Sequence, residues 1–106
     1  MTWREVLVRT AAHIKEHGLG KGAYGRKGQP CCTLGALRVV IWPSVMPAYA
    51  AANASPSEAA LYETCRNEIM NGLIARGFTG SIPPWNDRVE TTADEVIVLL
   101  EEVANG

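Results

Sequence analysis

The sequence lacks several features that would place it in a functional class directly. No apolar run approaches the roughly 20 residues that a membrane-spanning helix needs. The chain has 10 basic and 11 acidic side chains and a net charge of −1, so the positive surplus typical of nucleic-acid-binding proteins is absent. Its first residues follow a helical pattern rather than the basic-then-apolar order of a signal peptide. We therefore expect a cytoplasmic protein that binds neither nucleic acid nor membrane.

Cysteine is also scarce, since Cys31, Cys32 and Cys65 are the only three. An odd count argues against a secreted disulfide framework. The neighbours Cys31 and Cys32 rarely bond to each other, because the resulting ring is strained. We expect reduced thiols, as in a bacterial-type cytoplasm.

The sequence does contain a clear helical pattern of apolar residues, and its length fits a single domain. Its 106 residues, 47% of them hydrophobic, suffice for one modest core. Three helix starts carry a capping residue with a glutamate three positions later: Thr2 with Glu5, Ser55 with Glu58, and Thr92 with Glu95. The predicted helices span residues 3–17, 32–42, 56–76 and 93–104. This pattern predicts a mainly α fold, a small four-helix domain over residues 1–106.

Three connections join these helices. Residues 18–30 are rich in glycine and predict either an irregular loop or a minimal β-hairpin with arms at 22–24 and 29–31. Residues 43–55 are rich in alanine with two prolines, and one helical turn fits there. Residues 81–87 predict a rigid loop stiffened by Pro83 and Pro84.

Several segments together resemble a small domain family. They are Gly22-Ala23-Tyr24, Gly28, Pro30, Cys32-Thr33-Leu34-Gly35-Ala36-Leu37, Ser81-Ile82, Trp85-Asn86-Asp87 and Thr92-x-x-Glu95-Val96. The chain resembles DUF6197, an uncharacterised family of actinobacteria and their phages, over about residues 3–104. The resemblance implies a helical domain in an actinobacterial or phage setting and implies no activity. Leu19-Gly20-Lys21 stands where many members carry a tryptophan and a cysteine, which argues against a shared metal or catalytic site in this loop.

His13 and His17 are the first candidates for chemistry. They lie four residues apart on one helix face, which is metal-ligand spacing, and with Cys31, Cys32 or Cys65 they could form a zinc site. A second recognisable ligand pair is missing, and His17 already suits the negative end of its helix. We expect no bound metal and no cofactor.

Cys32 is a candidate nucleophile, because a helix N-terminus lowers a thiol pKa. His13 or His17 would be the base and Asp87 the orienting group. Nothing in the spacing requires this arrangement, and free cysteines are among the most buried residues. We expect Cys32 and Cys65 to be small core residues and the chain not to be an enzyme.

The glycine-rich segment suggests two weaker possibilities, a phosphate-binding or dinucleotide-binding loop and a nucleic-acid-binding surface. Its Gly-x-Gly-x-Gly run follows a helix, whereas a dinucleotide-binding run follows a strand. Its basic residues Lys21, Arg26 and Lys27 are too few to predict nucleic-acid binding.

Trp85-Asn86-Asp87 supports two interpretations. In the structural one, which we favour, Trp85 covers the core while Asn86 and Asp87 bond to nearby backbone groups. In the functional one, Trp85 is an exposed anchor for a partner. Trp42 and Tyr49, beside two prolines, could form a second patch of this kind.

Taken together, these patterns predict a non-catalytic interaction or regulatory protein. We expect it to be phage-encoded, to act in the host cytoplasm and to bind a host protein or a second copy of itself as a homodimer. A small-molecule or metal-binding domain is the first alternative, and a thiol-dependent enzyme the second.

Overall fold

The computed structural model describes residues 1–106 and contains helices and no β-strand. The elements are α1 (Trp3–His17), α2 (Thr33–Ile41), α3 (Pro47–Ala50), the 3₁₀-helix η1 (Ala51–Asn53), α4 (Pro56–Ala75), α5 (Ile82–Asp87) and α6 (Ala93–Asn105). The mainly α prediction is confirmed, and the four predicted helices agree with α1, α2, α4 and α6 within one residue at each end. No helix is both long enough and apolar enough to span a bilayer.

The predicted total of four helices is wrong, because two short helices join the four long ones. The predicted turn within residues 43–55 is present as α3 followed by η1. The expected loop at residues 81–87 is instead the helix α5. Its prolines Pro83 and Pro84 fall in the first turn, where a missing N–H costs no helical hydrogen bond.

Polar side chains cap the starts of the long helices. Thr2, Ser55 and Thr92 each accept a hydrogen bond from the backbone N–H three residues later, at 3.2 Å. Only at Ser55 does the glutamate also return the bond, with 2.8 Å from the Ser55 N–H to Glu58 Oε1. The capping box is thus complete at α4 alone, whereas α1 and α6 have the forward bond only.

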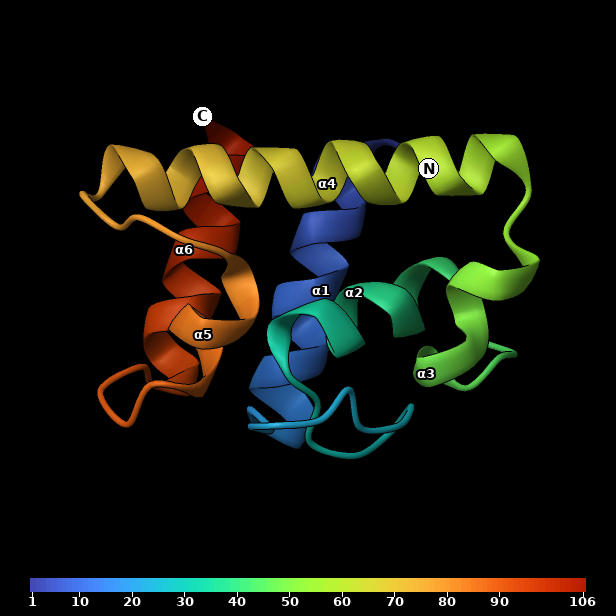
Figure 1. Ribbon diagram of the computed structural model, residues 1–106, viewed down its shortest axis with the longest axis horizontal. Helices are drawn as coiled ribbons and strands as arrows, with labels where there is room; N and C mark the ends of the chain where they lie inside the picture. The colour runs from blue at the N-terminus through green and yellow to red at the C-terminus, as the bar shows by residue number, and fades with distance from the viewer.

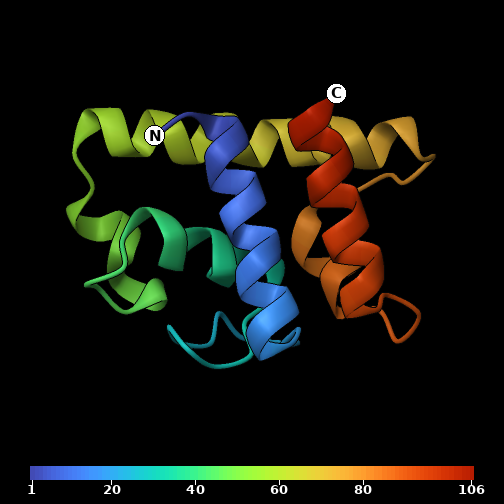
Figure 2. The ribbon, with the colours of Figure 1, turned by 180° about the vertical axis from the view of Figure 1, so that it is seen from behind.

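Helices α1 and α6 run antiparallel and side by side, and α4 crosses over both of them (Figures 1 and 2). Arg4 ties the start of α1 to the end of α6, because its Nη1 donates to the carbonyls of Ala104 (2.7 Å) and Gly106 (3.2 Å). A cation there also suits the negative end of the α6 dipole. The two ends of the chain are thereby held close together.

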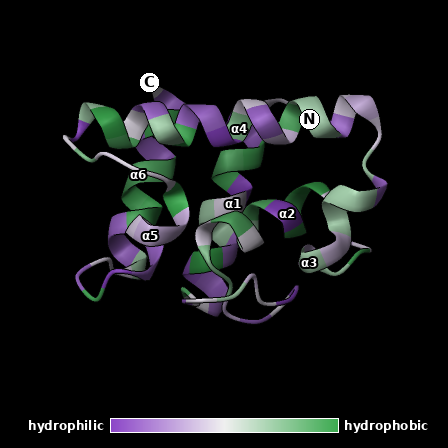
Figure 3. Ribbon diagram, in the orientation of Figure 1, coloured by the Kyte–Doolittle hydropathy of each residue, from purple (hydrophilic) through white to green (hydrophobic).

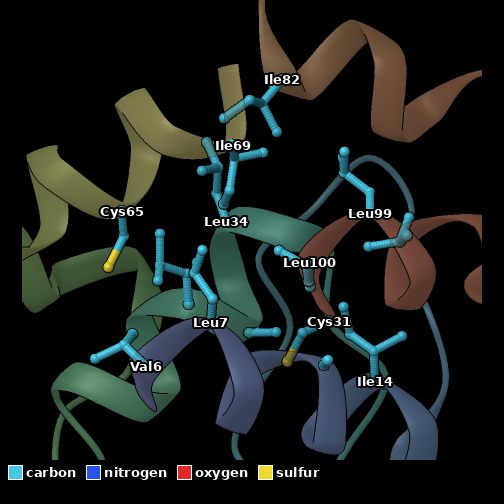
Figure 4. Close-up of a cluster of buried hydrophobic side chains, with 14 of the residues drawn as sticks. Val6, Leu7, Ile14, Cys31, Leu34, Cys65, Ile69, Ile82, Leu99 and Leu100 are labelled. Carbon is cyan, nitrogen blue, oxygen red and sulfur yellow. The ribbon is translucent and has the colours of Figure 1, made fainter. Parts of the chain in front are cut away.

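The core lies where the faces of five helices meet. The long helices carry both hydrophobic and hydrophilic residues (Figure 3), as an amphipathic helix on a core requires. Leu7, Leu34, Ile69, Ile82 and Leu100 come from α1, α2, α4, α5 and α6 and lie in one buried cluster (Figure 4). On α4 the buried residues are Tyr62, Cys65, Ile69 and Leu73, whereas Ile74 near the end of the helix is exposed.

Residues 18–30 form an irregular loop, so the hairpin alternative is wrong. One isolated parallel bridge joins Leu19 to Cys31, and the Gly20 N–H donates to the Cys31 carbonyl at 2.8 Å. Gly22, Gly25 and Gly28 have φ values of 79°, 76° and 80°. Residues with positive φ interrupt the extended backbone conformation that the arms of a hairpin need.

Gly35 brings this loop onto α2. A Cβ at this position would lie 1.8 Å from the Tyr24 carbonyl oxygen, so only glycine permits the observed approach. The glycine loop is therefore packed against the start of α2.

Candidate functional site

Asn86 joins three segments that the sequence keeps far apart. Its side chain is 1% exposed. Its Oδ1 accepts from the Thr33 backbone N–H (2.8 Å) and the Thr33 hydroxyl (2.6 Å), while Nδ2 donates to the Gly20 carbonyl (3.0 Å). Nδ2 also donates to Asp87 Oδ1 at 3.0 Å. One amide on α5 thus links this helix to the start of α2 and to the glycine loop, and both of its polar atoms have partners, as a buried polar group requires.

Lys21 and Asp87 continue this network at the surface. Lys21 Nζ donates to the carbonyls of Asn86 (2.8 Å) and Thr91 (2.8 Å), and also to that of Arg88, so it caps the end of α5. Asp87 Oδ1 accepts from the Gly22 N–H at 2.9 Å, and this hydrogen bond lowers the pKa of the carboxyl group. The Lys21 ammonium group is therefore engaged within the chain.

These contacts agree with the structural interpretation of Trp85-Asn86-Asp87. Trp85 is 4% exposed and packs edge-on against Phe78, with 6.4 Å between the ring centroids. Asn86 is buried as well, and both polar side chains bond to backbone groups. Trp85 and Asn86 are hence not presented at the surface as anchors, and Asp87 alone of the three is exposed.

Trp42 and Tyr49 do not share an exposed patch. Trp42 is buried and packs on Tyr62 with 5.6 Å between the ring centroids. Tyr49, on α3, is 65% exposed. The reason is that Trp42 ends α2 facing α4, whereas α3 turns Tyr49 outwards.

The surface around Tyr49 is apolar and is hereafter called the α3 corner, defined by Val45, Met46 and Tyr49. Their side chains are 39%, 43% and 65% exposed. A shallow hollow of about 230 Å³ beside them is also lined by Arg26 and Lys27 of the glycine loop. Neither cation forms an ion pair within the chain.

The structure does not assemble the donors that a zinc site would need. The His13 and His17 rings lie together, with centroids 4.7 Å apart, but no group of three histidine, cysteine, aspartate or glutamate side chains is placed to share a metal ion. His13 Nε2 instead accepts from the Gly28 N–H at 3.3 Å. Burial, and then the neighbouring His17, lowers the pKa of His13.

The three cysteine thiols are free. Cys32 caps α2, where its Sγ accepts from the Gly35 N–H at 3.3 Å, and it is half-buried rather than a core residue. Burial raises the pKa of Cys32 despite its place at a helix N-terminus. Burial also raises the pKa of Cys31 to about 11 and that of Cys65 to about 12. Cys65 is fully buried, as predicted.

Two clefts that the sequence did not predict are lined in part by residues of α2 and its N-cap. One of about 390 Å³ lies between the glycine loop and α5 and includes Cys32 and Asp87 in its lining. The other, of about 510 Å³, lies between α2, α4 and α5, with Arg38 in its lining. The sequence held one signal for the second cleft, because Arg38 is the only charged residue in the stretch from Gly28 to Ser57.

Comparison with known proteins supplies a family and no activity. No curated protein and no solved structure is detectably similar to the chain. A family described as a family of unknown function (DUF6197) matches residues 1–106. The chain therefore belongs to the DUF6197 family.

Proposed function

We propose that this protein is a non-catalytic interaction module that binds a protein partner through the α3 corner. The observation that carries the proposal is the exposure of Val45, Met46 and Tyr49 within five consecutive residues. Single exposed apolar side chains are common, but a contiguous group is typical of interaction surfaces. Tyrosine is in addition a residue type that often carries binding energy.

The charges beside the corner indicate the chemistry of the partner. Arg26 and Lys27 line the adjoining hollow and have no acidic neighbour bound to them. Complementary charge favours a partner that carries Asp or Glu next to an apolar anchor. The occupant we propose is thus an acidic protein segment with one aliphatic or aromatic side chain that packs against Tyr49.

The proposal also includes two further parts: the protein has no catalytic activity of its own, and it acts in the cytoplasm. The raised pKa of Cys32 and the lowered pKa of His13 both disfavour an activated thiolate–imidazolium pair. The three free thiols suit a cytoplasmic location. An actinobacterial or phage origin remains an expectation that rests on the resemblance alone.

Selection from a displayed library of random peptides tests the proposal, because it does not require the partner to be identified first. We expect enriched peptides to combine Asp or Glu with a large apolar residue. Their binding should weaken about tenfold or more in Met46→Ser/Tyr49→Ser. It should weaken also in Arg26→Glu/Lys27→Glu, and higher salt should reduce it in the original protein.

The matched control is Ile74→Ser/Val89→Ser, which removes two exposed apolar side chains elsewhere. The end of α4 and the loop after α5, which carry these residues, lie on the far side of the molecule from α3 (Figure 1). This variant should bind the selected peptides unchanged. Failure to enrich any peptide, or equal losses in the corner and control variants, would overturn the proposal.

A further inference from the structure

Arg38 is a half-buried cation whose guanidinium group lies close to two aromatic rings. Its guanidinium carbon lies 4.2 Å from the ring centroid of Tyr24 and 5.2 Å from that of Tyr62. No carboxylate forms an ion pair with it. A half-buried charge without a counter-ion is costly, so the group is poised to gain from binding an anion.

The guanidinium group also has hydrogen-bonding capacity to spare. Nε donates to the Tyr62 hydroxyl (3.1 Å) and Nη1 donates to the Pro47 carbonyl (3.0 Å). Arginine carries five N–H donors, so more than half remain for a ligand. The two bonds that exist fix the orientation of the planar group, which reduces the entropy lost when an anion binds.

Arg38 lines the cleft between α2, α4 and α5, and this cleft has the size and lining of a small-molecule site. Its volume is about 510 Å³, within the range of roughly 300–1,000 Å³ typical of ligand sites. Nine of its 14 lining residues are hydrophobic. The two other charged residues, Arg66 and Glu63, pair with each other at 2.8 Å. Arg38 is therefore the uncompensated charge of the cleft.

We propose that this cleft binds a small organic carboxylate, with Arg38 holding the carboxylate and the aromatic and aliphatic lining enclosing an apolar body. The planar fork of arginine matches a carboxylate through two parallel N–H···O bonds. A single free cation beside a mostly apolar lining suits one carboxylate on an apolar body better than a multiply charged phosphate. The site is distinct from the α3 corner, because none of Val45, Met46 and Tyr49 lines the cleft.

A paired ligand panel tests this site directly. Aromatic and branched aliphatic carboxylates, each beside its neutral primary amide, are titrated against the full chain by calorimetry and by NMR of the Arg38 side chain. We expect at least one carboxylate to bind about tenfold or more tightly than its amide, since charge-assisted hydrogen bonds are roughly twice as strong as neutral ones. Inorganic phosphate should bind more weakly than that carboxylate, because it has no apolar body.

Two kinds of variant separate recognition from folding. Arg38→Gln should abolish the preference for the acid, whereas Arg9→Gln, an exposed arginine outside the cleft, should retain it. Arg38 also donates hydrogen bonds to Tyr62 and to the Pro47 carbonyl of α3, so its replacement could disturb the fold. A second variant therefore leaves Arg38 in place. Ala59→Leu fills the cleft from the exposed surface of α4, and Ala60→Leu is its control outside the lining.

Binding of the carboxylate should be lost in Ala59→Leu and preserved in Ala60→Leu, with both variants folded by circular dichroism. Three results would each overturn the proposal. They are a panel in which no carboxylate binds, acids that bind no better than their amides, and unchanged binding by a folded Ala59→Leu protein.

Discussion

Replacement of Asn86 by leucine removes every hydrogen bond of a buried side chain and puts an apolar side chain of similar branching, somewhat larger in volume, in its place. Three groups then lose their partner: the Thr33 N–H, the Thr33 hydroxyl and the Gly20 carbonyl. Asp87 Oδ1 loses its bond from Asn86 Nδ2 as well, but it keeps the one from the Gly22 N–H. A buried polar group left unpaired costs about 1–3 kcal/mol. With partial access of water, we expect the free energy of unfolding to fall by roughly 3–6 kcal/mol.

Urea unfolding followed by far-ultraviolet circular dichroism measures this change. The control is Asn67→Leu, an exposed asparagine without a side-chain hydrogen bond, which should change stability by at most about 0.5 kcal/mol. If Asn86→Leu lost less than about 1 kcal/mol, the amide would not be the link between α5, α2 and the glycine loop that its geometry indicates.

A double-mutant cycle isolates the bond to the hydroxyl. Thr33→Val alone should cost about 1 kcal/mol, because one hydrogen bond at 2.6 Å is lost and the backbone bond remains. The same substitution in Asn86→Leu should cost less, because the hydroxyl there already lacks its acceptor. Additive effects of the two substitutions would refute the proposed coupling.

Further predictions concern the core, the loop contact and acid sensitivity. Trp85→Ala should lower the free energy of unfolding by about 3–5 kcal/mol, and an unchanged melting temperature would show that the indole does not seal the core. Gly35→Ala should cost about 1–3 kcal/mol or more, because the new Cβ would overlap the Tyr24 carbonyl; thermal unfolding beside wild type measures it. The pKa of His13 is lowered in the fold, so the unfolded chain binds the proton better, and stability should fall as pH drops through the ordinary histidine value of about 6.5. Urea midpoints on both sides of that pH should differ less in His13→Gln than in wild type. Native Cys65, with its pKa of about 12, should react with a thiol reagent far more slowly than in urea, and rapid native labelling would contradict its burial.

Parts of the site follow from local sequence and parts do not. The structural role of Trp85-Asn86-Asp87 could be predicted, since such residues bond to backbone and cover cores. The hydrogen-bond partners of Asn86 could not be predicted, because Gly20 and Thr33 lie 66 and 53 residues away from it in the sequence. Arg38 was missed as a ligand-binding candidate, although a lone charge on an apolar helix is a visible signal.

In the whole fold, too, some features follow from the local sequence and others only from tertiary packing. Sequence alone determined the long helices, because caps and hydrophobic periodicity act within a few residues of chain and bias those residues before any packing. It also determined that Cys65 belongs to a buried face. Tertiary structure decided which aromatic residues are exposed, since Trp42 packs on Tyr62 while Tyr49 turns to solvent. It decided as well that Arg38 stands without a counter-ion, because ion pairing and cleft formation depend on which distant surfaces meet.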